Sequence, residues 1–250
     1  MIIGISGLAG SGKNQAATYF REYGPIEVAL ADPLKRIARD VYAFTDEQLW
    51  GSSEFRNMPD RRYPRQHSWS PVGESRYVTC NCCGTQTPLS LIEDDVWAPD
   101  PTDAPCHLTA RYALQLLGTE WGRHLYPDTW VEYAIRTHDR LQAGGCAYDQ
   151  KRGLFTCSSV AGVMQPRTHI TIPDVRFRNE IEGIRKAGGK LVRIRRPGAG
   201  LQGSAGLHPS EREQASIPDT EFDLVLDNAG TLDDLRALVK KAAEVLGLPV

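Results

Sequence analysis

The first residues of the chain place glycines and one lysine at spacings that suit an anion. After the apolar stretch Ile2–Ile5, the residues of this pattern are Gly7, Gly10, Ser11, Gly12 and Lys13. Glycines let the backbone turn its N–H groups toward a phosphate, and a lysine at the start of the next helix adds a positive charge. We therefore expect this loop to bind a nucleoside triphosphate. The pattern G-x-x-x-x-G-K-[ST] fails only at Asn14, where a magnesium-binding hydroxyl is expected.

Charged residues also follow the later apolar strands. They are Asp32, Lys35 and Arg36 after 26–30, Asp174 and Arg176 at the end of 169–176, and Arg195 and Arg196 after 190–194. The carboxyl ends of parallel strands meet on one rim of a sheet, so these side chains should surround the bound phosphates. Carboxylates that position Mg²⁺ and cations that neutralise phosphate charge are what phosphoryl transfer requires.

Strands that alternate with helices predict an α/β fold, with a parallel five-stranded sheet flanked by helices. The expected strands are 2–5, 26–30, 169–176, 190–194 and 222–226, and the expected helices are 13–23, 32–44, 111–117, 130–141, 177–187 and 232–246. Residues 118–124 should connect two helices, and 144–168 should form a hairpin. We expect one domain over 1–250, with an insertion at 52–107 and a lid at 198–216, where a glycine-rich segment precedes His208, Ser210 and Glu211.

Composition narrows the classes of partner. The 29 basic and 31 acidic residues give a formal charge of −2, which argues against a nucleic-acid partner. No apolar run reaches the roughly 20 residues that span a bilayer, so no membrane partner is expected. The N-terminal residues carry no basic segment followed by an apolar one, and we therefore expect a cytoplasmic protein.

Clustered cysteines in a cytoplasmic protein favour a metal site over disulfides. Cys80 and Cys83 have a Cys-x-x-Cys spacing that suits a structural Zn²⁺. The second pair of ligands stays open between Cys106 with His107 and Cys146 with Cys157. The alternative interpretation is a set of reduced, partly buried thiols.

Several stretches together resemble the phage-type deoxynucleoside monophosphate kinases. Beyond the loop, they are Leu30–Lys35, Leu114–Arg123 followed by Pro127–Trp130, Asp174–Glu180, His208–Glu211 and Asp227–Thr231. They occur in the family's order and cover most of the chain outside 52–107 and 144–165. The resemblance implies transfer of the ATP γ-phosphoryl group to a dNMP with Mg²⁺, a homodimer, and a place in the host cytoplasm if a phage encodes the protein.

The resemblance also assigns roles to residues. Catalysis falls to Lys13, Asp174 and Arg176, and ATP binding to Gly7, Gly10, Ser11, Gly12, Lys13, Asn14, Arg195 and Arg196. Acceptor binding falls to Asp32, Lys35, Arg36, Arg65, Trp121, Arg123, Arg176 and Asn179. Asp174 would position Mg²⁺, directly or through water, or cap the next helix. Trp121 would offer a stacking face or pack in the core.

Two other functions remain open at this stage. One is a kinase that acts on another acceptor, either dephospho-coenzyme A or a modified base in DNA. The basic run Arg56–Arg65, with the aromatic residues Trp69 and Tyr77, is the only feature that favours a DNA acceptor. The other is a non-catalytic ATP-binding module, which the missing hydroxyl at Asn14 would suit.

Overall fold

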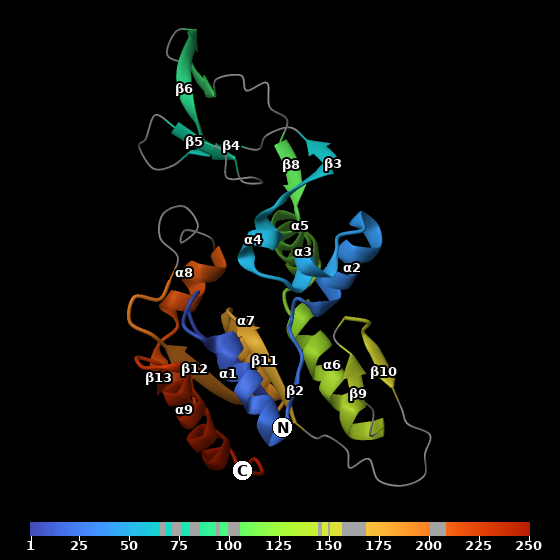
Figure 1. Cartoon of the computed structure of the whole chain (residues 1–250), viewed down its shortest axis with the longest axis vertical. Helices are drawn as coiled ribbons and strands as arrows, with labels where there is room; N and C mark the ends of the chain where they lie inside the picture. Colours follow the sequence, from blue (N-terminus) through green and yellow to red (C-terminus); the bar gives the residue numbers. More distant parts are fainter. Residues whose placement is uncertain are drawn as a thin grey trace. The chain divides into compact units, whose positions relative to one another are not determined.

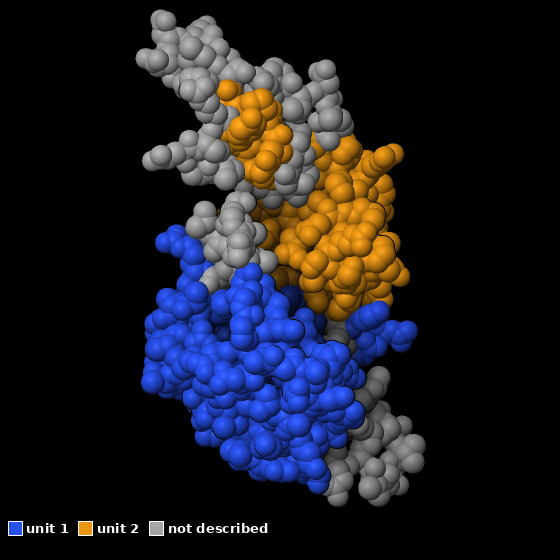
Figure 2. Space-filling view, turned by 60° about the vertical axis from the view of Figure 1, so that its left-hand side comes forward, with its two compact units in different colours: residues 1–33, 122–250 blue, residues 34–121 orange. Residues whose placement is uncertain are grey.

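The structure is a computed structural model (Figure 1). It describes residues 1–65, 69–71, 77–80, 86–93, 96–99, 106–144, 147–149, 151–156, 169–200 and 209–250. These residues form two compact units, residues 1–33 with 122–250 and residues 34–121, which Figure 2 colours separately. The predicted insertion 52–107 lies inside the second unit.

The first unit is built on a sheet of five parallel strands, as predicted. The order across the sheet is β13-β12-β1-β11-β2. The strands are β1 (Ile2–Ser6), β2 (Ile26–Glu27), β11 (Ile170–Val175), β12 (Lys190–Arg195) and β13 (Leu224–Asp227). The connection after β1 leads to one side of that strand, and the connection after β11 crosses to the other side. The carboxyl end of β1 is therefore the point where ligands bind in sheets of this kind.

Helices cover both faces of this sheet, which explains why the central strands are apolar throughout. On one face, α1 (Lys13–Phe20) and α9 (Leu232–Val245) share a buried core with Ile3 and Ile5. On the other face lies α7 (Arg178–Lys186), so close that a Cβ on Gly4 would be 2.7 Å from Ile184 Cδ1. The α/β fold with flanking helices is thus confirmed.

Strand β2 is shorter than the predicted 26–30, because its backbone leaves the sheet early. Val28 N still donates to Thr171 O at 2.8 Å. The next two N–H groups donate instead to carboxylates, Ala29 N to Asp32 Oδ2 and Leu30 N to Asp174 Oδ1, both at 2.9 Å. Side chains thus replace the neighbouring strand as hydrogen-bond partners.

The remaining elements of the first unit are short apart from one helix. They are a 3₁₀ turn (Arg21–Tyr23), α6 (Thr129–Gly144), the antiparallel strands β9 (Ala147–Asp149) and β10 (Leu154–Thr156), α8 (Pro209–Ser216) and a second 3₁₀ turn (Asp219–Glu221). The β9–β10 pair supplies the hairpin expected within 144–168. None of the helices in the described ranges is both long and apolar enough to cross a membrane.

The second unit combines helices with antiparallel strands. Its elements are α2 (Asp32–Tyr42, which begins in the first unit), α3 (Asp46–Trp50), α4 (Ser53–Asn57), β3 (Pro59–Arg65), β4 (Trp69–Pro71), β5 (Tyr77–Cys80), β6 (Gln86–Glu93), β7 (Val96–Pro99), β8 (Cys106–Thr109) and α5 (Ala110–Leu116). Strands β4 to β7 form one sheet, and β3 pairs with β8 in another. A small core contains Phe44, Leu49 and Ala113. The insertion therefore has regular strands, which its fading apolar periodicity did not predict.

The expected connection at 118–124 is a π-helix, Leu117–Arg123. Helices of this type are rare and are frequently found at functional sites. Gly122 is required here, since a Cβ at this position would lie 2.0 Å from Cζ2 of the buried Trp130. The packing of Trp130 against bare backbone thus fixes the chain next to Arg123.

Two alanine substitutions in this π-helix should differ in their effect on stability. We expect Gly122→Ala to lower the free energy of unfolding by about 1–3 kcal/mol, because Trp130 must move. At Gly118 the described residues place one atom near a Cβ, Leu34 Cδ1 at 3.3 Å, which a small shift of that side chain relieves. Gly118→Ala should therefore change the free energy of unfolding much less than Gly122→Ala. Thermal unfolding of the two variants tests this, and equal melting temperatures would contradict the packing argument.

Candidate active site

The loop between β1 and α1 has a backbone that only glycines can form. Gly10 and Gly12 have positive φ angles of 78° and 95°, a region that strains other residues. A Cβ on Gly7 would lie 2.5 Å from Ser11 Oγ and 2.6 Å from Ile194 O. The backbone therefore wraps closely around the N-terminal end of α1, where an anion is stabilised.

Two polar side chains of this loop support the same interpretation. Lys13 begins α1, and its Nζ donates to Leu8 O at 3.3 Å across the loop. Ser11 Oγ is buried and has no hydrogen-bond partner among the residues that the structure describes. A buried hydroxyl without a partner is costly, and a bound phosphate would supply one. Asn14, by contrast, is exposed on the first turn of α1.

Asn228 supports the loop from the neighbouring end of β13. Its backbone N–H donates to Arg195 O at 2.7 Å, and its side-chain Nδ2 donates to Ser11 O at 2.8 Å. The residue is buried, and its amide occupies the space that a Cβ on Gly12 would need. It follows β13 directly, and its role as a support depends on a contact with Ser11, 217 residues away in the sequence.

Asp174 at the end of β11 holds the backbone that follows β2. Its two carboxylate oxygens accept the N–H groups of Leu30 and Ala31 at 2.9 and 3.2 Å. Asp32 is buried and accepts the N–H of Ala29 at 2.9 Å. A carboxylate has about four acceptor positions, so Asp174 keeps some for Mg²⁺ or for water bound to it. Both predicted acidic residues thus anchor the segment on which acceptor binding is expected.

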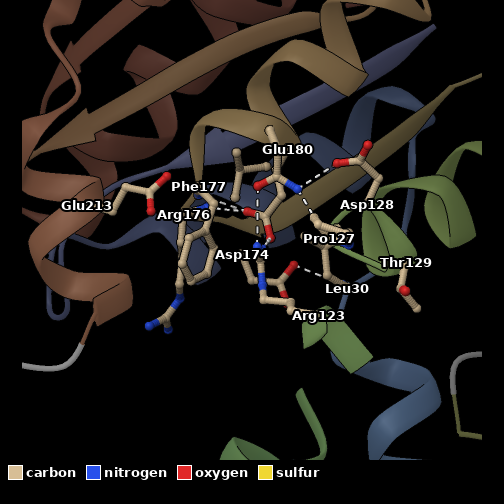
Figure 3. Close-up of polar contacts among 12 residues, drawn as sticks. Leu30, Arg123, Pro127, Asp128, Thr129, Asp174, Arg176, Phe177, Glu180 and Glu213 are labelled. Atoms are coloured by element: carbon tan, nitrogen blue, oxygen red, sulfur yellow. Dashed lines mark hydrogen bonds and ion pairs between the residues drawn. The ribbon is translucent and has the colours of Figure 1, made fainter. Parts of the chain in front are cut away.

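A buried ion pair lies beside Asp174, and sequence reasoning missed one partner (Figure 3). Arg123 donates to Oε1 of Glu180 and lies 3.5 Å from the ring centre of Phe177. Oε2 of Glu180 accepts the N–H groups of Arg176 and Phe177 at 2.7 and 3.0 Å. One carboxylate therefore orients a predicted acceptor-site arginine and fixes the backbone of the predicted catalytic arginine.

Asn179 extends this cluster toward the start of α6. Its Oδ1 accepts from Arg123 at 3.3 Å, and its Nδ2 donates to Pro127 O and Asp128 Oδ1 at 2.9 and 2.8 Å. Three of the predicted motifs, around Arg123, Asp128 and Asp174–Glu180, are thereby joined. Asn179 was predicted to bind the acceptor, and in the structure it also connects these segments.

A pocket of about 430 Å³ adjoins the glycine loop. Leu8 and Ser11 line one side, and Arg195, Arg196 and Pro218 are among the residues of the other sides. Arg195 forms ion pairs of 2.6 Å with both Asp219 and Asp227, which fix its position. Arg196 forms no ion pair with the described residues, so of the two predicted ATP-binding arginines it is the better placed to contact a ligand.

The end of α8 is tied to the carboxyl ends of two strands. Gln214 is buried, and its Nε2 donates to Ser6 Oγ and Val175 O, both at 3.1 Å. The predicted lid, 198–216, is therefore anchored at its C-terminal end. Residues 201–208, including His208, lie outside the described residues, as do the side chains of Ser210 and Glu211.

The other predicted acceptor residues belong to the second unit. Lys35 Nζ lies 5.4 Å from the ring centre of Trp50, and Arg65 Cζ lies 4.5 Å from that of Tyr112. Arg36 is half-buried on α2. Trp121 is 49% exposed at the π-helix, which fits a stacking face better than core packing. These four residues are placed within their own unit only.

The buried carboxyl group of Glu180 should make stability depend on pH. Burial raises its pKa from 4.5 to about 7, against the opposing effects of Arg123 and the two N–H groups. The folded chain then binds more protons than the unfolded chain between these values, so this contribution is complete below pH 4.5 and is lost as pH rises through 7.

We expect Glu180→Gln to remove this dependence, which is worth up to about 3 kcal/mol. Glu182→Gln, on an exposed position of the same helix, is the matched control and should behave like the wild type. Melting temperatures from pH 5 to pH 8 make the comparison. If Glu180→Gln kept the full wild-type slope, the buried carboxyl would not be its source.

Removing the support at Asn228 should weaken nucleotide binding. We expect Asn228→Ala to raise the dissociation constant for ATP about tenfold, since the loop loses a buried hydrogen bond. Asn57→Ala, at an exposed position of α4, serves as the control. Calorimetric titration of both variants decides the matter, and wild-type affinity in Asn228→Ala would show that the loop holds its shape unaided.

Comparison with known proteins found a relative that matches nearly the whole chain. No family model matches the chain. The chain is 29% identical over 238 residues to a protein of Acanthamoeba polyphaga mimivirus, an alignment that covers 94% of this chain and 91% of the relative. That protein is named "putative deoxynucleotide monophosphate kinase". The match spans both units, and the name together with the fold supports a nucleotide kinase. The resemblance to the deoxynucleoside monophosphate kinases that the motifs indicate is thereby confirmed.

Proposed function

We propose that this protein transfers the γ-phosphoryl group of ATP to a deoxynucleoside monophosphate, which yields a dNDP and ADP. The observation that carries the proposal is the glycine loop with Lys13 at the carboxyl end of the central strand. The named function of the mimivirus relative points to the same reaction class.

The loop and the adjoining pocket suit the donor nucleotide. The backbone of Gly10 to Gly12 and the ammonium of Lys13 would bind the β- and γ-phosphates. The pocket continues from Ser11 to Arg196, and its volume lies in the range that small-ligand sites occupy. We therefore place the nucleoside of ATP there, with Arg196 beside it.

The carboxyl end of β11 suits the reacting groups. Mg²⁺ would be held by oxygen atoms of Asp174 and Asn14, directly or through water, and when bound it neutralises phosphate charge. Arg176 would contact the transferring or the acceptor phosphate. Arg123, oriented by Glu180 and Phe177, would bind the acceptor. Phosphate oxygens are already ionised at neutral pH, so positioning and charge neutralisation suffice without a general base.

The acceptor base and sugar would contact the segments that the carboxylates anchor. Asp32, Lys35 and Trp121 are the residues we propose for this role, with Arg36, Arg65 and Asn179 as further contacts. A panel of four dNMPs, the matching rNMPs, dephospho-coenzyme A and DNA, assayed with ATP and Mg²⁺, separates the acceptor classes. ADP formation only in the assays that contain a dNMP supports the proposal. ADP formation only with dephospho-coenzyme A or with DNA would contradict it and would identify that compound as the acceptor.

Lys13→Ala should lower kcat about a thousandfold, because the ammonium neutralises charge that develops on the transferring group. Asn14→Ala should still bind ATP, with only a modest loss of affinity. Lys240→Ala, at an exposed position of α9, is the control for loss of a lysine and should match the wild type. A coupled assay of ADP formation measures all three, and a kcat for Lys13→Ala near that of the wild type would end the assignment.

A further inference from the structure

Two cysteine sulfurs meet inside the second unit. Cys80 ends β5 and Cys106 begins β8, and both side chains are buried. Their Sγ atoms are 3.6 Å apart. A disulfide bond would need about 2.05 Å, so this pair is not covalently joined.

The separation suits two ligands of one tetrahedral metal ion. With Zn–S bonds of about 2.3 Å and a tetrahedral angle, two thiolate ligands lie about 3.8 Å apart. We propose that Cys80 and Cys106 are two thiolate ligands of a structural zinc ion. Zinc is preferred over harder cations because thiolates are soft ligands.

The position of the pair explains what such an ion would do. Strand β5 belongs to the sheet β4–β7, whereas β8 belongs to the separate pair β3–β8. Apart from the two cysteines, the core cluster at this point contains only the packed ring of Tyr112 among the described residues. A metal ion would therefore join two separate sheets at this point, and its binding energy would add to folding.

Two thiolates leave two positions of a tetrahedral ion for other ligands. Cys83, three residues after Cys80 in the sequence, lies outside the described residues. His107 is a weaker candidate, because it follows Cys106 directly in β8 and consecutive side chains of a strand point to opposite faces. The described residues hold no group of three or more metal-binding side chains, so the proposal covers Cys80 and Cys106.

The zinc content of the full chain, purified without chelators, tests the proposal. We expect about one zinc per chain in the wild type and less than about one-tenth in Cys80→Ser and in Cys106→Ser. Cys146→Ser is the control, since it removes a thiol from the alternative pair and should keep its zinc. His107→Ala should keep the zinc content of the wild type.

Poor folding of a serine variant could itself remove the metal, so a second measurement uses the wild type alone. Treatment with a zinc chelator should lower the melting temperature, and added Zn²⁺ but not Mg²⁺ should restore it. Less than about one-tenth of an equivalent of zinc in the wild type, or wild-type content in Cys106→Ser, would overturn the proposal. A Cys80–Cys106 disulfide in the protein as purified would overturn it as well.

Discussion

The candidate site depends on the lack of a side chain at Gly7, where the carboxyl end of β1 turns into the loop. Ser11 Oγ and Ile194 O occupy the space that a Cβ would need. This close approach brings the loop against the end of β12, and Asn228 supports it from the end of β13. Three neighbouring strands thus determine the shape of a loop that has little packing of its own.

Carboxylates at and near the strand ends organise the backbone around the candidate site. Asp174 and Asp32 hold the chain after β2, and Glu180 holds the chain after β11. Glu180 also orients Arg123, at the cost of burying a carboxyl group whose pKa rises to about 7. Catalysis by charge neutralisation needs such fixed positions, because a mobile cation would have to be reorganised at each turnover.

The two units differ in how their folds are stabilised. The first has a continuous apolar core between a parallel sheet and the helices on its faces. The second has a small core around Phe44 and Leu49, and its strands form two separate sheets. A zinc ion at Cys80 and Cys106 would supply to the second unit what apolar burial supplies to the first.

Patterns that are local in sequence predicted most of the first unit. The glycine loop and the order of strands and helices both depend on neighbouring residues. Three features depend on contacts between distant residues and were missed. Glu180 has the sequence context of an ordinary helix residue, and its role comes from the ion pair with Arg123. Strand β2 ends early because Asp174 accepts a backbone N–H that a neighbouring strand would otherwise accept. Gln214 contacts Ser6, which is 208 residues away in the sequence. The π-helix was not predicted because its glycines are typical of a loop, and the packing of Trp130 against Gly122 is not visible in the local pattern.

The central claim is that the loop at β1 holds ATP while its terminal phosphoryl group moves to a deoxynucleoside monophosphate. Phosphorus NMR of the wild-type protein with ATP, Mg²⁺ and each dNMP in turn follows that group directly. The account predicts that ATP signals are replaced by those of ADP and of one or more dNDPs in equal amounts. Release of inorganic phosphate without any dNDP, or unchanged ATP with every dNMP, would contradict it.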